Sequence, residues 1–107
     1  MTKLACNVPC TIGGTTLVVL NFECQRSGGS NDRAAFRIIR RVAGQGDVIL
    51  PTAPQFVLSN DRDVRCWQFI DVGVPVTGDV SYVVQIMRIN GAGNFFAIQI
   101  SGVHCRR

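Results

Sequence analysis

The sequence has few charged side chains, few of the residues that do acid–base chemistry, and no long apolar run. Charged residues make up 17% of its 107 residues, where about 25% is usual. The only lysine is Lys3 and the only histidine is His104. No run of 18 apolar residues occurs, so we expect no membrane-spanning helix. The first residues also lack the apolar segment of a signal peptide.

The shortage of charge implies a largely neutral surface, which fits a chain that is covered by a partner or a second copy better than a free monomer. The formal net charge is +4, from 11 basic and 7 acidic residues. The basic excess gathers at Arg37, Arg40 and Arg41 and at the end of the chain, Arg106 and Arg107. Because no run of five basic residues occurs, we expect solvated arginines or inter-subunit ion pairs here, and no nucleic-acid partner.

Helical periodicity is nearly absent, and the recurring period is the two-residue period of strands. Residues 16–25 alternate, and their inward set is expected to be Thr16, Val18, Leu20, Phe22 and Cys24. Further strands are expected at 34–42, 48–50, 55–59, 64–71, 79–89 and 94–103. Gly, Pro and Asn/Asp turns separate these segments. Seven or eight short strands in a chain of this length predict one all-β domain, an antiparallel β-sandwich with Greek-key or jelly-roll connections.

Several of these strands are apolar on both faces; Val83, for example, follows Tyr82 directly. A sandwich buries only one face of each sheet, so the second apolar set needs another cover. Self-association supplies that cover most simply, and loops of the same chain are the alternative. The face that we expect to form a subunit interface carries Leu17, Val19, Trp67 and Phe69.

The five cysteines are Cys6, Cys10, Cys24, Cys66 and Cys105. An odd number does not form a closed disulfide framework. Cys6 and Cys10 are four residues apart, but no CxxC pair or second histidine supports a zinc site. We therefore expect buried free thiols in a protein made in a reducing cytosol. A bridge among Cys6, Cys10 and Cys105 stays open if the two ends of the chain meet.

No arrangement of residues predicts catalysis, a cofactor or a metal ion. His104 is followed directly by Cys105, so the two point to opposite faces of a strand and do not form a dyad. Asp61 and Asp63 lie among turn residues without the remaining ligands of a calcium loop. No glycine-rich segment has the lysine of a phosphate-binding loop. We expect a structural or binding protein and not an enzyme.

Four short segments resemble the C-terminal heads of bacteriophage tail fibres and related virion proteins. They are 36–40 (Phe-Arg-Ile-Ile-Arg), 71–75 (Asp-Val-Gly-Val-Pro), 80–86 (Val-Ser-Tyr-Val-Val-Gln-Ile) and 96–100 (Phe-Ala-Ile-Gln-Ile). The resemblance spans roughly residues 15–103. It implies a jelly roll of the tumour-necrosis-factor type and a homotrimer on the surface of a virion, on the capsid or the tail, made in the host cytoplasm.

We expect no shaft segment ahead of the domain, which would be a departure from the fibre pattern. We therefore expect a capsid decoration, or cement, protein with an N-terminal arm over residues 1–14 and a jelly-roll domain over 15–107. Its expected partner is the major capsid protein or another virion protein. The alternative is a tail-fibre head in which loops at 27–33 and 60–63 contact a host surface receptor. An enzyme or lectin on the same fold is a third possibility.

Overall fold

The computed structural model describes residues 3–26, 33–50, 55–59, 61–90 and 93–106, and it confirms the all-β prediction. No helix occurs among these residues. The eight strands are β1 (Lys3–Cys10), β2 (Thr15–Arg26), β3 (Arg33–Arg41), β4 (Val48–Ile49), β5 (Gln55–Val57), β6 (Asp63–Val72), β7 (Gly78–Asn90) and β8 (Gly93–Cys105). Seven of them lie where the two-residue period predicts a strand, and β1 is the addition.

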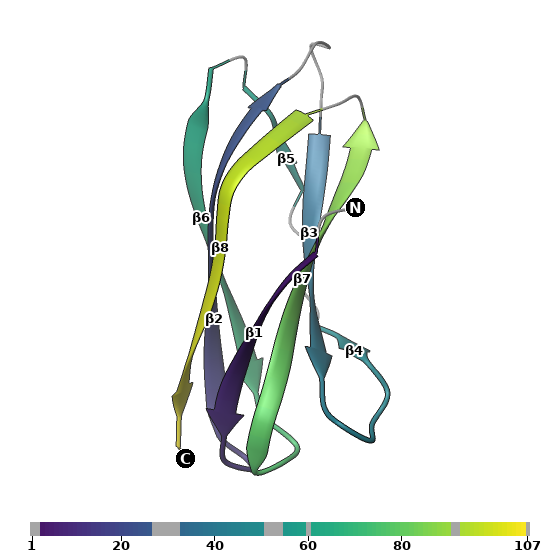
Figure 1. Cartoon of the computed structure of the whole chain (residues 1–107), viewed down its shortest axis with the longest axis vertical. Helices are drawn as coiled ribbons and strands as arrows, with labels where there is room; N and C mark the ends of the chain where they lie inside the picture. Colours follow the sequence, from purple (N-terminus) through teal and green to yellow (C-terminus); the bar gives the residue numbers. More distant parts are fainter. Residues whose placement is uncertain (1–2, 27–32, 51–54, 60, 91–92, 107) are drawn as a thin grey trace.

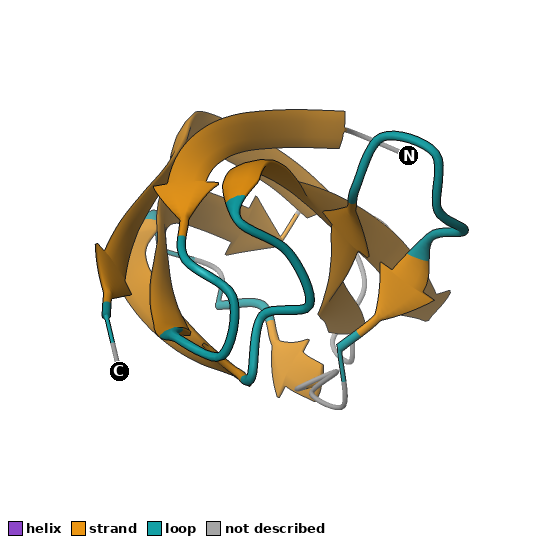
Figure 2. Cartoon of the chain, turned by 90° about the horizontal axis from the view of Figure 1, so that it is seen from below, coloured by secondary structure: helices purple, strands orange, loops and turns teal. Residues whose placement is uncertain are grey.

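The strands form two antiparallel sheets that pack face to face as a β-sandwich (Figure 1). The larger sheet has the order β1-β7-β3-β4, with β5 also paired to β3. The smaller sheet has the order β6-β2-β8. Seen from below, the two sheets curve around one interior, which the turns close at this end (Figure 2). The long sequence separations between paired strands exclude a simple meander.

Three antiparallel pairs are nested within one another in the sequence. β1 pairs with β7 in the larger sheet, β2 pairs with β6 in the smaller sheet, and β3 pairs with β5 in the larger sheet again. The chain therefore crosses from one sheet to the other between successive pairs, as a Greek-key route requires. The specific jelly-roll route stays a prediction.

Strand β2 supplies much of the core, with the face that its period predicts. Every second side chain of β2, from Thr16 to Cys24, is buried. In the β2–β6 register, Phe69 lies opposite Val18 and Trp67 lies opposite Leu20. Directly opposed residues of an antiparallel pair point to the same side of the sheet, so both aromatic side chains of β6 point inward.

Aromatic rings fill one end of the interior. Phe22 meets Phe36 edge to face with ring centroids 4.6 Å apart. Phe56 stacks on Phe36 at 5.3 Å, and Phe95 lies within 6.3 Å of all three rings. Such offset and edge-to-face contacts are the favourable geometries for aromatic pairs. This cluster joins β2, β3, β5 and β8 across the two sheets.

The segment expected to be an N-terminal arm is largely a strand of the domain. Lys3–Cys10 pairs with β7 along its whole length, and Val8 and Cys10 are buried. At this edge the larger sheet meets β8 of the smaller one, and a Cβ atom on Gly102 would lie 2.5 Å from Val8 Cγ2. Only glycine allows β8 to approach β1 this closely. The expected boundary after residue 14 therefore falls in the β1–β2 turn, inside the domain.

Candidate functional site

The outer face of the three-stranded sheet is the most unusual surface of the chain. Four cross-strand rows, from Thr15 to Asn21 of β2, cover most of it. Their outward positions are Thr15, Leu17, Val19 and Asn21 on β2, Cys66, Gln68, Ile70 and Val72 on β6, and Gln99, Ser101, Val103 and Cys105 on β8. None of these twelve side chains carries a charge. We call these twelve residues the uncharged face.

Apolar side chains of the uncharged face are left open to solvent. Ile70 is 63% exposed, Val72 74% and Val103 59%. Leu17 lies between Ile70 and Val103 in one cross-strand row, so the three form a continuous apolar strip. A contiguous apolar patch on a surface marks a contact site for another molecule. The apolar strip is suited to contact with another apolar surface.

A charged boundary closes the uncharged face at one end. Glu23 follows the last row of β2, and its carboxylate accepts from the Arg62 guanidinium at 3.2 Å. The same guanidinium lies 3.9 Å from the ring centroid of Phe96. In the same row Val64, the β6 partner of Glu23, is 76% exposed. Charge therefore sits at the rim of the apolar strip and not within it, as in many protein interfaces.

The outer face of the larger sheet has the opposite character. Arg37 and Arg41 of β3 are partnered there, Arg37 by the Gln85 side chain at 2.5 Å and Arg41 by Asp47 at 2.9 Å. Val83 and Ile39 also occupy outward positions of this sheet, yet both are buried. The arginine group expected from the sequence to be solvated therefore lies mostly on this face, with Arg40 as the exception.

The structure separates the four residues that were expected to share one interface. Leu17 and Val19 lie on the uncharged face, half-buried between neighbouring strands. Phe69 is buried in the core, and Trp67 is partly buried against it. The expectation of one common face is wrong, because the β2–β6 register turns Trp67 and Phe69 inward and presents Ile70 and Val72 instead. That Leu17 and Val19 contact a second subunit stays a prediction.

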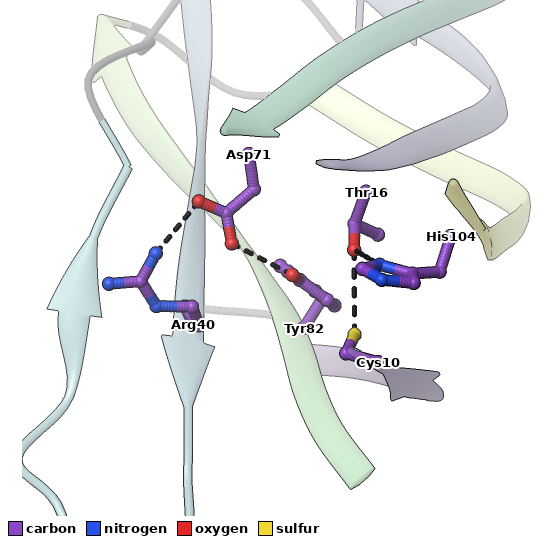
Figure 3. Close-up of polar contacts among 6 residues, drawn as sticks. All are labelled: Cys10, Thr16, Arg40, Asp71, Tyr82 and His104. Carbon is purple, nitrogen blue, oxygen red and sulfur yellow. Dashed lines mark hydrogen bonds and ion pairs between the residues drawn. The ribbon is translucent and has the colours of Figure 1, made fainter. Parts of the chain in front are cut away.

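A polar layer crosses the interior at the end away from the aromatic cluster (Figure 3). Asp71 of β6 is buried, and both carboxylate oxygens are engaged by the opposite sheet. Oδ1 accepts from the Arg40 guanidinium at 2.7 Å, and Oδ2 accepts from the Tyr82 hydroxyl at 2.7 Å. Arg40 and Tyr82 are neighbours on β3 and β7. Asp71 therefore fastens the smaller sheet to two strands of the larger one.

Tyr82 is fully buried, and its environment keeps its phenol protonated. Burial, first, and then the hydrogen bond and negative charge of Asp71 raise the pKa of Tyr82 far above its usual range. A hydrogen bond from Thr16 acts in the opposite direction and is outweighed. The phenol therefore donates to Asp71 at any pH near neutrality, and it is not available as a general base.

The layer continues from Thr16 to His104, which lie opposite each other on β2 and β8. The backbone N–H of Thr11 donates to His104 Nε2 at 2.9 Å. In the neutral ring the proton is then on Nδ1, which donates to Thr16 Oγ1 at 2.8 Å. His104 thus holds the β1–β2 turn against the end of β8. Gly14 of this turn must be glycine, since a Cβ atom there would lie 2.5 Å from His104 Nε2.

The side chains of the polar layer mostly have partners within the chain, as in a structural network. Cys10 Sγ contacts the Val8 carbonyl at 3.3 Å and Thr16 Oγ1 at 3.5 Å, and it is buried. The remaining gap in the network is Arg40 Nε, which is buried without a hydrogen-bond partner. The sequence did not single out Arg40 as an inward residue, because the other inward positions of β3 are apolar. The available signal was the alternation of Phe36 and Ile38, which Arg40 continues on the same face.

The cysteines are free and only in part as expected. Cys10 and Cys24 are buried, Cys6 is half-buried, and Cys66 and Cys105 are exposed on the uncharged face. Burial raises the pKa of the Cys6 thiol and of the Cys24 thiol. None of the three bridges left open by the sequence is formed. Within the described part of the chain, no cluster of three metal-ligating side chains occurs.

The loops proposed to contact a receptor span residues 27–33 and 60–63. Of these, residues 27–32 and residue 60 lie outside the described residues.

His104 and Cys105 point to opposite faces of β8, as the sequence predicted, with Cys105 exposed. In the ranges that the structure describes, we find no helix that is long and apolar enough to cross a membrane.

Comparisons with known proteins do not assign the chain to a family. No protein-family model matches the sequence. A comparison with curated proteins gives no significant match. The functional argument therefore rests on the uncharged face and the polar layer.

Proposed function

We propose that the protein is a non-enzymatic structural module that works by contact through its uncharged face, as a capsid decoration protein on the outside of a phage-like particle. The observation that carries the proposal is the strip of Leu17, Ile70 and Val103 on a face without charged side chains. The resemblance of four segments to virion surface proteins is the reason for proposing a phage-like particle as the partner. The partner is then a shell protein with a flat apolar surface.

The energetics favour contact as the role of this face. Covering an exposed valine or isoleucine contributes about 1.5–3 kcal/mol when burial is complete. Ile70, Val72 and Val103 are each more than half exposed, so their burial stabilises a complex substantially. A bound decoration protein stabilises a particle by mass action, because it binds the assembled shell and not its separated subunits. No catalytic residue is required.

The experiment is co-sedimentation with virions purified from the source of the sequence, using the natural chain and two matched variants. Ile70→Lys places a charge on the uncharged face, and Ile49→Lys places the same charge on β4 of the other sheet, where Ile49 is 56% exposed. We expect Ile70→Lys to reduce the bound fraction about tenfold, since a lysine must be desolvated on binding. Ile49→Lys should change it less than twofold.

Two outcomes contradict the proposal. One is the absence of co-sedimentation by the natural chain. The other is an equal loss for both variants, which would place the contact elsewhere or show that lysine acts on solubility. The homotrimer implied by the resemblance stays a prediction, and the alternative of a tail-fibre head predicts binding of the isolated chain to host cells. Binding to cells without binding to capsids would favour that alternative.

A further inference from the structure

Strand β6 is a long sheet edge with nothing paired to its outer side. It forms one border of the order β6-β2-β8, and no described strand pairs with its other edge. Its ten residues, Asp63–Val72, therefore leave alternate backbone N–H and C=O groups free on that side. An edge of this length is a template for another strand.

The other sheet borders are short or obstructed. β4 has only two residues. β8 has a register shift opposite Asn21 and Glu23, with Ala97 at a φ of 48°, and it lies against β1 at Gly102. Bulges and covering strands are the usual protection of a sheet edge. β6 has neither, since its register with β2 runs without interruption from Asp63 to Val72.

The outward side chains of β6 also lack the usual protection, and its charged residues, such as Arg65, are on the inward face. Its outward positions are Val64, Cys66, Gln68, Ile70 and Val72, all exposed. They include no lysine, no proline and no charge, the residues that discourage pairing at an edge. Such an edge is suited to pairing with another strand, and the side chains of β6 indicate which strand this is.

We propose that β6 pairs in antiparallel fashion with β6 of a second copy of this chain, about a twofold axis that passes through Gln68. The two smaller sheets then form one continuous six-stranded sheet. This proposal goes beyond the proposed function and does not rest on it, since the pairing joins backbone groups at the edge of the sheet, beside the four residues that β6 contributes to the uncharged face.

The pairing of the outward side chains supports a second copy as the occupant. With the axis at Gln68, Val64 lies opposite Val72 of the second copy, and Cys66 lies opposite Ile70 of the second copy. Gln68 lies opposite its own counterpart, where two amides can hydrogen-bond. The most exposed apolar side chains of β6, Val64 at 76% and Val72 at 74%, thus cover each other. Cross-strand apolar pairs of this kind stabilise a sheet.

The inward side chains are complementary in the same register. Trp67 lies opposite Phe69 of the second copy, an aromatic pair. Arg65 lies opposite Asp71 of the second copy without like-charge repulsion, and each keeps the partners that it has within its own chain, the Val57 carbonyl for Arg65 and Arg40 and Tyr82 for Asp71. The two nearest alternatives that keep the faces aligned have the axis at Trp67 or at Phe69. An axis at Trp67 would place Asp63 opposite Asp71, two like charges. An axis at Phe69 would place Trp67 opposite Asp71 and Val64 opposite a residue beyond the end of β6, so the axis at Gln68 is favoured.

The first experiment is the solution mass by light scattering behind size exclusion, over a range of concentrations. We expect twice the 11.7 kDa of one chain. The variant Gln68→Lys puts two ammonium groups beside the twofold axis and should raise the concentration at which half the dimer dissociates about tenfold, since like charges placed together across an interface are strongly unfavourable. The matched control is Ser101→Lys.

Ser101 and Gln68 flank Val19 in the same cross-strand row, and both are exposed. Ser101→Lys therefore adds the same charge to the same face, but on β8. Edge pairing predicts that Ser101→Lys leaves the dimer intact. An equal loss with Ser101→Lys would overturn the proposal in favour of face-to-face packing. A mass of one chain, or the mass of three expected from the resemblance, would overturn it as well.

A crosslink tests the register. The variant Ile70→Cys places its new thiol opposite Cys66 of the second copy, with the Cα atoms about 4.5–5.5 Å apart, inside the range for a disulfide. Within one chain these positions are four residues apart on a strand, about 13 Å, and cannot be joined. Mild oxidation should give a covalent dimer that disappears when Cys66→Ser is added. A covalent dimer that persists without Cys66, or no crosslink at all, would contradict the register.

Discussion

At one end of the sandwich interior Phe22, Phe36 and Phe56 pack ring against ring, whereas at the other end Asp71, Arg40 and Tyr82 join the sheets through polar contacts. On β2, Phe22 belongs to the aromatic end and Thr16 to the polar end. The two residues are six positions apart, about 20 Å along the strand. Both ends cross from one sheet to the other, but they do so by different forces.

The difference separates bulk stability from alignment. Apolar contacts depend on buried area and tolerate small shifts between the sheets. The polar layer is directional, and a buried ion pair returns little net free energy once desolvation is included. Its geometry is met only when Asp71 of β6 faces Arg40 and Tyr82 at the same time. We infer that the aromatic end supplies most of the stability and the polar end selects one relative placement of the sheets.

The largest effect is expected from breaking the aromatic end. Phe22→Ala removes a ring that contacts Phe36, Phe56 and Phe95, and it leaves a cavity in the core. We expect a loss of about 4 kcal/mol in the free energy of unfolding, measured by urea denaturation. Phe96→Ala is the control, since that ring lies outside the core beside Arg62. Equal losses for the two variants would contradict the assignment of the core.

Breaking the polar end should cost somewhat less. Asp71→Asn leaves the Arg40 guanidinium buried without its counter-charge, which we expect to lower the free energy of unfolding by about 3 kcal/mol. The loss should be largely shared with Arg40→Met, so the double variant should lose much less than the sum of the singles. Asp47→Asn, in the exposed pair with Arg41, should leave the urea midpoint nearly unchanged. Additive losses at Asp71 and Arg40 would show that the pair is not coupled.

The smallest effect, and the one that depends on pH, belongs to Tyr82. Tyr82→Phe removes one hydrogen bond to a buried carboxylate and should cost about 1.5 kcal/mol at pH 7. In the folded chain the phenol keeps its proton, while in the unfolded chain it ionises near pH 10. Above that pH the folded state binds more protons, so the free energy of unfolding falls as pH rises.

The pH prediction can be tested by following the ionisation of Tyr82 alone. Tyr82 is the only tyrosine, so phenolate absorbance reports on it alone. We expect no phenolate signal from the folded chain near pH 10–11, and a steeper alkaline loss of stability in the natural chain than in Tyr82→Phe. Ionisation of the Tyr82 phenol near pH 10 in the folded chain would show that burial does not raise its pKa.

Much of the secondary structure follows from the sequence, because alternation is a local property. The predicted segment at 64–71 lies within β6, and the one at 79–89 lies within β7. The sequence did not predict β1, because Lys3–Cys10 alternates weakly and includes Pro9. Its strand is formed by pairing with β7 along the sheet edge, a contact that local pattern does not show.

The candidate site was only half predictable. Leu17 and Val19 could be placed outside, because the opposite face of β2 is more uniformly apolar. On β6 both faces are apolar, with Trp67 and Phe69 on one and Cys66 and Ile70 on the other, so the period of two alone does not say which points inward. The β2–β6 register decides it. The pairing of Arg40 with Asp71, a residue 31 positions away, is likewise a contact that local pattern does not show.

The all-β character, the positions of most strands and the low charge of the surface could be derived from the amino-acid sequence, since these depend on composition and on neighbours along the chain. The pairing of the strands, the buried face of β6 and the open edge became known only from the fold. Those features depend on contacts between residues far apart in the sequence, and a one-residue change of register would exchange the core for the surface.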